Sequence, residues 1–131
     1  MTEVLTHLMF QGGAKSALER YREAFSDFKV EWLTLSEDGT ELQQARVSFA
    51  GHTLFIFKSP ISHAFSFTPS ISLFVSMQDE ADVRAAFEKL AKDGTVLMPL
   101  AAYDFSPLYG WLQDSFGVSW QLSVVAPVPP N

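Results

Sequence analysis

The feature that most constrains the fold of this chain is an order of elements, strand, helix, strand, strand, strand, that occurs twice. Apolar side chains recur at helical spacing over residues 14–25 and again over residues 79–92, so the two expected helices begin about 65 residues apart. Short apolar runs of strand character flank each helix in the same order. One such module leaves an apolar sheet face uncovered. The repeat therefore predicts two modules that pair and curve around a shared interior.

Turn residues bound the expected elements of each module. Strands are expected at 4–10, 30–35, 43–49 and 52–57 in the first module, and at 71–77, 95–98, 109–113 and 118–125 in the second. Ala50-Gly51 joins a hairpin, and Asp79 is the expected N-cap of the second helix. Gly94 closes that helix and Pro99 ends the strand after it. Asp114 to Gly117 is a turn, because Asp bonds its own backbone and Gly tolerates positive φ.

These elements predict an α+β fold in which two βαβββ modules form a curved mixed sheet around a cavity. A length of 131 residues suits one domain, residues 1–131. Its expected parts are module one at about 3–58, a connector at 59–70, module two at about 71–125 and a Pro-rich tail at 126–131. The tail cannot join a central strand, since proline lacks the N–H that a sheet requires.

Charge and cysteine content exclude several classes of function. The net charge of −6 argues against nucleic-acid binding, which needs a basic face, and provides no attraction to an anionic membrane. No apolar run is long enough to span a bilayer. The absence of cysteine excludes disulfides and thiol catalysis and fits a reducing compartment. The first residues lack the pattern of a signal peptide, so a cytoplasmic location is expected.

Two segments carry a resemblance to a known family. Leu8-Met9-Phe10-Gln11-Gly12 lies near the start, with Ala17 and Tyr21 after it, and the more specific segment is Asp114-Ser115-Phe116-Gly117-Val118-Ser119-Trp120-Gln121. In these, and over nearly its whole length, the chain resembles the vicinal oxygen chelate superfamily of glyoxalase, bleomycin resistance and dioxygenase proteins. More narrowly it resembles the PhnB-like branch, which carries the label 3-demethylubiquinone 3-methyltransferase-like. The resemblance implies paired βαβββ modules, a U-shaped cavity and commonly a homodimer.

The resemblance also indicates where a metal ion would be bound. Metal-dependent members use His or Glu from the first and fourth strands of each module. Those positions fall on Thr6, or one residue later on His7, and on Phe55 or Phe57 in module one. In module two they fall on Ser72 and Gln121. A divalent ion needs three or more strong donors, so we expect no metal and no cofactor. The methyltransferase label is a family name only, since no glycine-rich nucleotide-binding unit is present.

Other polar and aromatic residues permit both a functional and a structural interpretation. Tyr103 and Tyr109 are candidates to orient a polar substrate, with Asp104 as general base, although a surface loop with aromatic anchors is the more frequent use of such a segment. Trp111 and Trp120 either stack on a planar ligand or pack in a core. The histidines His7, His52 and His63 either supply a base or a relocated metal site, or serve as turn, connector and surface residues.

We therefore expect a small-molecule binding protein that lacks the usual metal ligands of its scaffold. The alternative is an enzyme acting on a small oxygenated or aromatic substrate, either metal-independent or with a displaced metal, for which His7, Tyr103 and Asp104 are candidates. The expected ligand-binding residues are Thr6, Phe55, Phe57, Ser72, Tyr109, Trp111 and Gln121. Surplus aromatics predict a homodimer whose interface includes part of residues 60–70 or 103–111.

Overall fold

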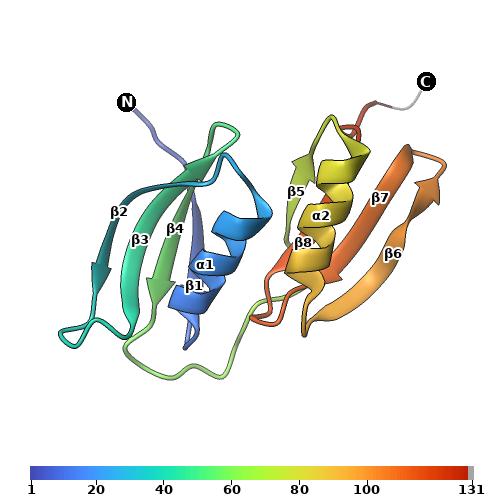
Figure 1. The fold of residues 1–131 in the computed structure, drawn as a ribbon. Coiled ribbons are helices and arrows are strands. Elements are labelled where there is room, and N and C mark those ends of the chain that lie inside the picture. The colour runs from blue at the N-terminus through green and yellow to red at the C-terminus, as the bar shows by residue number, and fades with distance from the viewer. Residues whose placement is uncertain (130–131) are drawn as a thin grey trace. The chain divides into compact units, whose positions relative to one another are not determined.

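Two compact units make up the chain, residues 1–66 and residues 67–131, and the computed structural model describes residues 1–129. The first unit contains β1 (Thr6–Phe10), α1 (Ala14–Ala24), β2 (Lys29–Leu35), β3 (Leu42–Phe49) and β4 (His52–Lys58). The second contains β5 (Ser72–Ser76), α2 (Glu80–Ala91), β6 (Thr95–Tyr103), β7 (Ser106–Gln113) and β8 (Ser119–Ser123). The repeated βαβββ order and the α+β class are confirmed (Figure 1). That the two modules together enclose one cavity stays a prediction.

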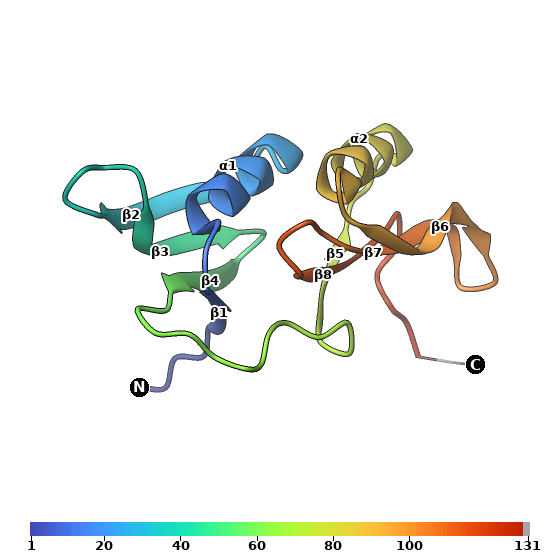
Figure 2. The same ribbon diagram turned by 90° about the horizontal axis from the view of Figure 1, so that it is seen from below.

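The first unit is a four-stranded mixed sheet with one helix on it. Its strand order is β1-β4-β3-β2, in which β1 and β4 are parallel and the other pairs antiparallel. Helix α1 buries Ala14, Ala17, Leu18 and Tyr21, which recur at helical spacing. This stripe covers the sheet face that carries Leu8, Phe10, Val47, Leu54 and Ile56, all of them buried (Figure 2).

The β3–β4 hairpin turns where the sequence places it. Ala50 and Gly51 take φ values of +51° and +76°, which is the left-handed conformation that a two-residue hairpin turn requires. This turn fixes the register of the two strands, so that Val47 lies opposite Leu54 on the face covered by α1.

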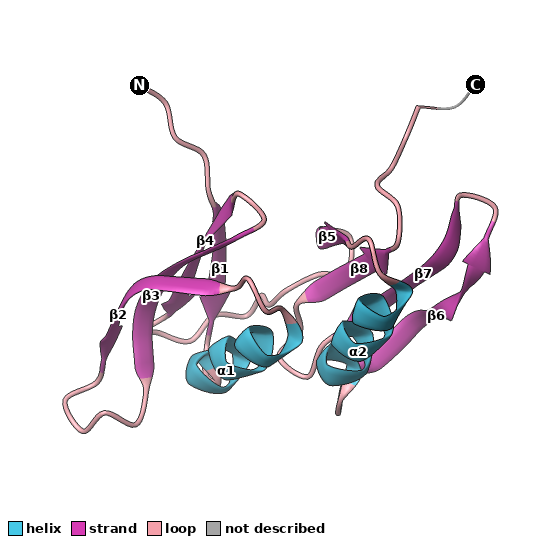
Figure 3. Cartoon of the chain, turned by 45° about the horizontal axis from the view of Figure 1, so that its top comes forward, coloured by secondary structure: helices cyan, strands magenta, loops and turns pink. Residues whose placement is uncertain are grey.

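The second unit repeats the same topology with the order β5-β8-β7-β6, again with only the outer pair β5 and β8 parallel. Helix α2 lies against this sheet (Figure 3). It buries Val83, Ala86, Phe87 and Leu90, and Leu112, Trp120 and Leu122 are buried in the sheet. Trp120 is fully buried in this core, so the packing interpretation of that tryptophan is confirmed. Asp79 stands at the N-cap as predicted, but its side chain makes no capping hydrogen bond.

The sequence-based boundaries of β6 and β7 were wrong. Pro99 does not end β6, which continues to Tyr103, because β6 is the edge strand and an edge strand tolerates a residue without N–H. The β6–β7 register is irregular on either side of this proline. Strand β7 begins at Ser106 and not at Tyr109, so Asp104 and Phe105 form a hairpin turn instead of a long loop.

Asp114 organises the turn between β7 and β8. Its side chain is only 4% exposed, and its Oδ1 accepts hydrogen bonds from the backbone N–H groups of Phe116 at 2.9 Å and Val118 at 3.0 Å. Its Oδ2 accepts a third from Trp120 Nε1 at 3.0 Å. Gly117 takes φ +102°. The predicted turn at 114–117 is confirmed. The Asp114 carboxylate accepts hydrogen bonds both from backbone groups of the turn and from the buried Trp120.

Gly94 is required for a reason other than helix capping. Asp93, and not Gly94, adopts the positive φ after α2, at +60°. A Cβ atom on Gly94 would lie 2.4 Å from the Gln113 carbonyl oxygen and 3.0 Å from the Asp114 Cα atom. Both neighbours are backbone atoms of the β7 end, which cannot move without disturbing the Asp114 turn.

We therefore expect Gly94→Ala to destabilise the protein by about 2–4 kcal/mol, at or above the upper end of the range for overpacking, because the clash is with backbone. Gly12→Ala is the matched control, since a Cβ there meets nothing within 4 Å. Urea unfolding of both variants measures the difference. Equal midpoints for the two variants would show that the β7 end yields to the added methyl group.

Candidate functional site

The sheet face of the second unit opposite α2 carries most of the sequence-predicted site residues of that unit. We call it the open face. Side chains alternate along a strand, so residues that flank the buried Leu112, Trp120 and Leu122 point to this side. Its members are Phe74, Tyr109, Trp111, Gln113, Ser119, Gln121 and Ser123. Gln121 is central among them, because it pairs with Trp111 on β7 and with Phe74 on β5.

Ser72 and Ser119 form a hydroxyl cluster at one end of this face. Their Oγ atoms lie 2.6 Å apart, and Trp111 Nε1 donates to Ser119 Oγ at 2.9 Å. The carbonyl oxygen of Pro69 accepts from Ser119 Oγ at 3.3 Å and from Ser72 Oγ at 3.4 Å. The hydroxyl of Ser72 is therefore used within the protein.

A second polar pair lies beside this cluster. The Tyr109 hydroxyl donates to Gln121 Oε1 at 2.5 Å, and Tyr109 itself is only 4% exposed. Burial, together with the nearby Tyr103 phenol, raises the pKa of Tyr109 above its usual 10.0. The phenol is therefore neutral and donating at physiological pH. Gln121 Oε1 accepts one hydrogen bond and has a second lone pair, and no residue within 1–129 accepts from its Nε2.

A cavity of about 370 Å³ opens beside Gln121 and Tyr109. Its other lining residues come from β5, the β6–β7 turn, the end of β8 and the tail: Phe74, Asp104, Phe105, Ser123, Val125, Ala126, Pro127 and Val128. Most of these side chains are apolar or aromatic, and few polar groups converge, as in sites for small organic ligands. The cavity brings together three of the predicted residues, Asp104, Tyr109 and Gln121.

Sequence reasoning missed two parts of this lining. Phe74 shares a strand face with Ser72, two residues away, so strand alternation alone could have found it. The tail at 126–131 is expected from the sequence only to be unable to join a central strand. The two residues before it are held to the sheet, because Val124 N–H donates to the Leu108 carbonyl at 3.0 Å and Val125 N–H to Ser123 Oγ at 3.2 Å. These hydrogen bonds place residues of the tail in the cavity lining, and no sequence pattern predicts this.

Aromatic rings cluster around the β6–β7 turn. The ring of Phe105 meets that of Tyr109 edge to face at 4.8 Å between centroids and stacks with Tyr103 at 5.7 Å. Phe74 lies 6.2 Å from Tyr109. The Tyr103 hydroxyl donates to the Pro99 carbonyl at 2.7 Å, within its own strand, and Tyr103 is not among the cavity-lining residues. The Tyr103 hydroxyl is therefore used within its own strand, while its ring belongs to the aromatic cluster.

The corresponding residues of the first unit form a different surface. His7 stacks on Phe55 with 5.4 Å between centroids and contacts Phe57 at 5.6 Å, so these three share the sheet face opposite α1. Thr6 lies on the other side of β1 by strand alternation. Its Oγ1 hydrogen-bonds His52 Nε2 at 2.8 Å. Of the two alternatives for the first-strand position, His7 is the one that lies beside Phe55 and Phe57.

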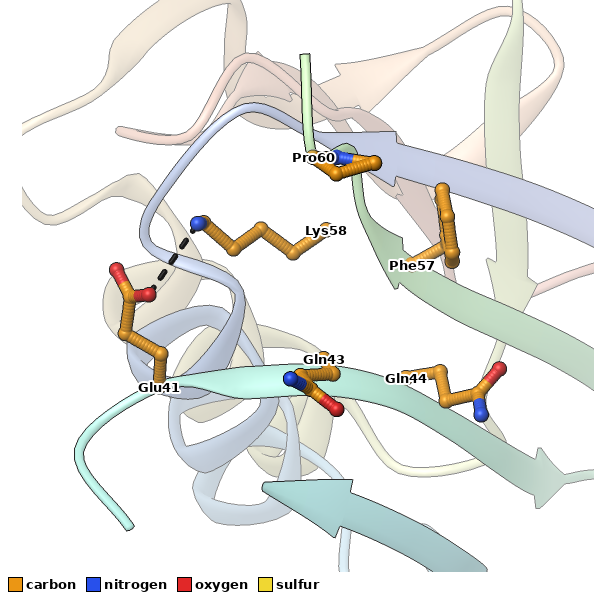
Figure 4. Close-up of a pocket in the computed structure, with 6 residues that line it drawn as sticks. All are labelled: Glu41, Gln43, Gln44, Phe57, Lys58 and Pro60. Atoms are coloured by element: carbon orange, nitrogen blue, oxygen red, sulfur yellow. Dashed lines mark hydrogen bonds and ion pairs between the residues drawn. The ribbon is translucent and has the colours of Figure 1, made fainter. Parts of the chain in front are cut away.

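A hollow of about 270 Å³ borders this surface of the first unit (Figure 4). Glu41, Gln43, Gln44, Phe57, Lys58 and Pro60 line it. Lys58 Nζ and Glu41 Oε2 form an ion pair at 3.2 Å beside the hollow, so the Lys58 side chain that lines it is already paired. The predicted site residues thus occur in more than two environments. His7, Phe55 and Phe57 share an aromatic surface of the first unit, and Asp104, Tyr109 and Gln121 line the cavity of the second. Thr6 lies on the other side of β1, and Ser72 and Trp111 belong to the hydroxyl cluster.

The potential metal-ligating side chains of the described residues are dispersed. Within residues 1–129, no group of three or more His, Cys, Asp or Glu side chains is arranged to hold a metal ion. The three histidines have separate surroundings: His7 stacks on Phe55, His52 binds Thr6, and His63 Nε2 lies 2.9 Å from Ser59 Oγ.

No helix in the described part of the chain combines the length and apolar character needed to cross a membrane.

Comparison with known proteins places these features in a family. The sequence profile of the family described as 3-demethylubiquinone-9 3-methyltransferase matches residues 2–123. A solved structure from Bacillus cereus, described as a putative 3-demethylubiquinone-9 3-methyltransferase, PhnB protein, is 36% identical, with a TM-score of 0.85 over 93% of this chain and 98% of that one. No curated protein matches the chain.

More distant structures share the fold alone. A glyoxalase-related enzyme from Fulvimarina pelagi is 19% identical, with a TM-score of 0.67 over 94% of this chain and 88% of that one. The fosfomycin resistance protein FosX from Listeria monocytogenes, solved with Mn(II) and a dihydroxypropylphosphonic acid, is 10% identical, with a TM-score of 0.61 over 96% and 94% of the two chains.

The raised pKa of Tyr109 leads to a titration that can be measured. Ultraviolet absorbance of phenolate, compared between the wild type and Tyr109→Phe, isolates this residue, and we expect its ionisation above pH 10.0. The stability that the buried neutral phenol contributes is complete below its unfolded-state pKa and is lost as the pH rises through the higher folded-state pKa. A difference spectrum that titrates at or below 10.0 would contradict the burial argument.

Proposed function

Because this chain belongs to the 3-demethylubiquinone-9 3-methyltransferase family, the PhnB-like branch of the vicinal oxygen chelate superfamily, we propose that it binds a small organic molecule on the open face of its second unit. The observation that carries the proposal is the Tyr109–Gln121 pair beside a cavity of about 370 Å³. This pair holds one amide group, Gln121 Nε2, toward a ligand. The surrounding Phe74 and Phe105 supply apolar contact area.

We further propose that binding requires no metal ion. The superfamily positions of the second unit fall on Ser72 and Gln121. The Ser72 hydroxyl already contacts Ser119 Oγ and the Pro69 carbonyl, and Gln121 Oε1 already accepts from Tyr109. Phe55 and Phe57 of the first unit offer no donor atom. These residues do not fit a divalent ion, which takes several charged or strongly donating ligands. The chemistry of FosX with its Mn(II) is therefore not carried over to this chain.

Catalysis on a small oxygenated or aromatic substrate is the second candidate function. Asp104 favours it, since this carboxylate lines the same cavity as Gln121 and Tyr109 and could accept a proton from a bound substrate. Tyr103, the other candidate on this hairpin, donates its hydroxyl proton to the Pro99 carbonyl instead. His7, a candidate base of the first unit, is stacked on Phe55. Binding is the better supported function, because it needs only the groups that the cavity already presents.

The proposal includes a homodimer in a reducing, cytoplasmic compartment, with the chain acting as one domain. Ile61 and Phe65 in the connector are 65% and 60% exposed, and Phe105 in the β6–β7 turn is 58% exposed. Soluble proteins usually cover such groups of apolar side chains, and a symmetric second copy is a common means of doing so. Edge strand β2 adds exposed Trp32 and Leu35. The compartment is inferred from the cysteine-free sequence.

A fragment screen by ligand-observed magnetic resonance tests the binding site. We expect small aromatic compounds to bind the wild type and to lose binding by about tenfold or more in Ala126→Trp, because the new side chain fills the cavity that Ala126 lines. Ala85→Trp, on the exposed side of α2, is the matched control and should bind as the wild type does. Equal loss in both variants, or no binding to the wild type, would refute the proposed site.

Metal analysis tests the second part of the proposal. Protein purified without chelator and then dialysed is expected to hold far less than one equivalent of Zn, Mn, Ni or Fe per chain. Treatment with chelator should leave fragment binding unchanged, since no lining residue depends on an ion. One stable equivalent of metal, or binding that returns only after metal is added, would refute the metal-free proposal while leaving the cavity as the site.

Light scattering at micromolar concentration tests the assembly. We expect twice the chain mass for the wild type. The double variant Ile61→Ser with Phe65→Ser should shift the population toward the monomer, because it removes two exposed apolar groups from the expected interface. A wild-type mass equal to one chain would show that these side chains are covered within the chain or tolerated in water, and that the dimer is not formed.

A further inference from the structure

We propose that the cavity of the second unit selects an organic cation, a ligand that carries an ammonium or comparable positive group on a small apolar body. The inference rests on the proposed function and names the class of ligand for the same cavity. Three features of the lining point to it: aromatic rings from three separate segments, one carboxylate, and the absence of any Lys, Arg or His side chain among the described lining residues.

Two of the three rings are exposed beside the cavity. Phe74 on β5 is 39% exposed and Phe105 on the β6–β7 turn is 58% exposed, whereas Tyr109 is only 4% exposed. Tyr109 lies between them, with its ring centroid 6.2 Å from Phe74 and 4.8 Å from Phe105. An aromatic face carries partial negative charge and attracts a cation placed within about 6 Å of its centroid. Phe74 and Phe105 are the rings that an ammonium group can contact directly, and the buried Tyr109 holds its place between them.

Asp104 adds a full negative charge to this ring cluster. It precedes Phe105 in the hairpin turn, and no residue within 1–129 forms an ion pair or a hydrogen bond with its side chain. The charge is therefore not neutralised by the protein. A cation bound against Phe105 would receive both the attraction of the ring and that of the carboxylate.

The polar groups of the lining do not suit an anion. The Tyr109 hydroxyl donates its proton to Gln121 Oε1, and the Ser123 hydroxyl donates its own to Ser106 Oγ at 2.9 Å. Gln121 Nε2 is the one remaining side-chain donor of the described lining. An anion would therefore meet one donor and an unpaired carboxylate, whereas a cation meets that carboxylate and the exposed rings of Phe74 and Phe105.

Three phenols of similar shape distinguish charge from hydrophobic contact. Meta-hydroxyphenyltrimethylammonium is cationic, meta-tert-butylphenol is its neutral isostere, and meta-hydroxybenzenesulfonate is anionic. Isothermal calorimetry with the full chain is expected to give about tenfold tighter binding for the cation than for the neutral compound, and no measurable binding of the sulfonate.

Variants assign this preference to the residues named. Asp104→Asn should reduce the ratio of the affinity for the cation to the affinity for the neutral phenol by about threefold or more. Phe105→Leu, which keeps apolar bulk but removes the ring face, should also reduce it. Asp82→Asn on α2 removes the same unit of charge outside the cavity lining, and should leave the preference unchanged.

The outcomes separate this inference from the proposed function. Equal affinity for the neutral phenol and the cation would overturn the cation inference and leave small-molecule binding intact. Loss of the preference in Asp82→Asn as well as Asp104→Asn would overturn it too, since the effect would then come from net charge. If the fragment screen finds ligands for the cavity but the cation does not bind, the inference fails alone. If no compound of any kind binds, the proposed function fails with it.

Discussion

The buried carboxylate of Asp114 is the interaction on which the arrangement of the second unit depends. It accepts hydrogen bonds from two backbone N–H groups of the β7–β8 turn and from the indole N–H of Trp120. These bonds connect the hairpin turn to the core under α2. This sets the register that places Trp111 opposite Gln121. A shift of one residue would send Gln121 into the core and Trp120 to the open face, because side chains alternate along the strand. The polar face and the apolar core are thus specified by the same turn.

The two units use one topology for two different surfaces. In both, a helix covers one sheet face, and the outer parallel pair places the first strand beside the fourth. In the first unit that pair carries His7 and Phe55, stacked on each other. In the second it carries Ser72, Phe74 and Gln121, with hydroxyl and amide groups between the rings. The fold constrains where such residues lie, while their chemistry differs from one unit to the other.

Periodicity in the sequence was enough to predict the helices, the repeat, the hairpin at Ala50-Gly51 and the Asp114 turn, because each is determined by local chemistry. Pro99 was misinterpreted, since whether a proline ends a strand depends on that strand being at the edge of a sheet, which is a tertiary property. The role of Gly94 also escaped prediction, because the backbone atoms that crowd it belong to residues 113 and 114. The choice between Thr6 and His7 needed the register of β1 against β4.

The amide of Gln121 changes what this position can do in the protein. A carboxylate on the same strand would be an anion beside Tyr109, and its burial would need a cation or several donors to offset the loss of solvation. A neutral amide avoids that requirement: it accepts from one phenol and keeps an N–H group for a ligand. The cavity can therefore be lined mainly by rings and aliphatic groups. Among the described lining residues the one charged side chain is that of Asp104, which lies in the β6–β7 turn and not on the sheet. Separating the charge from the strand allows an apolar ligand body to rest on the open face while a polar group reaches the turn.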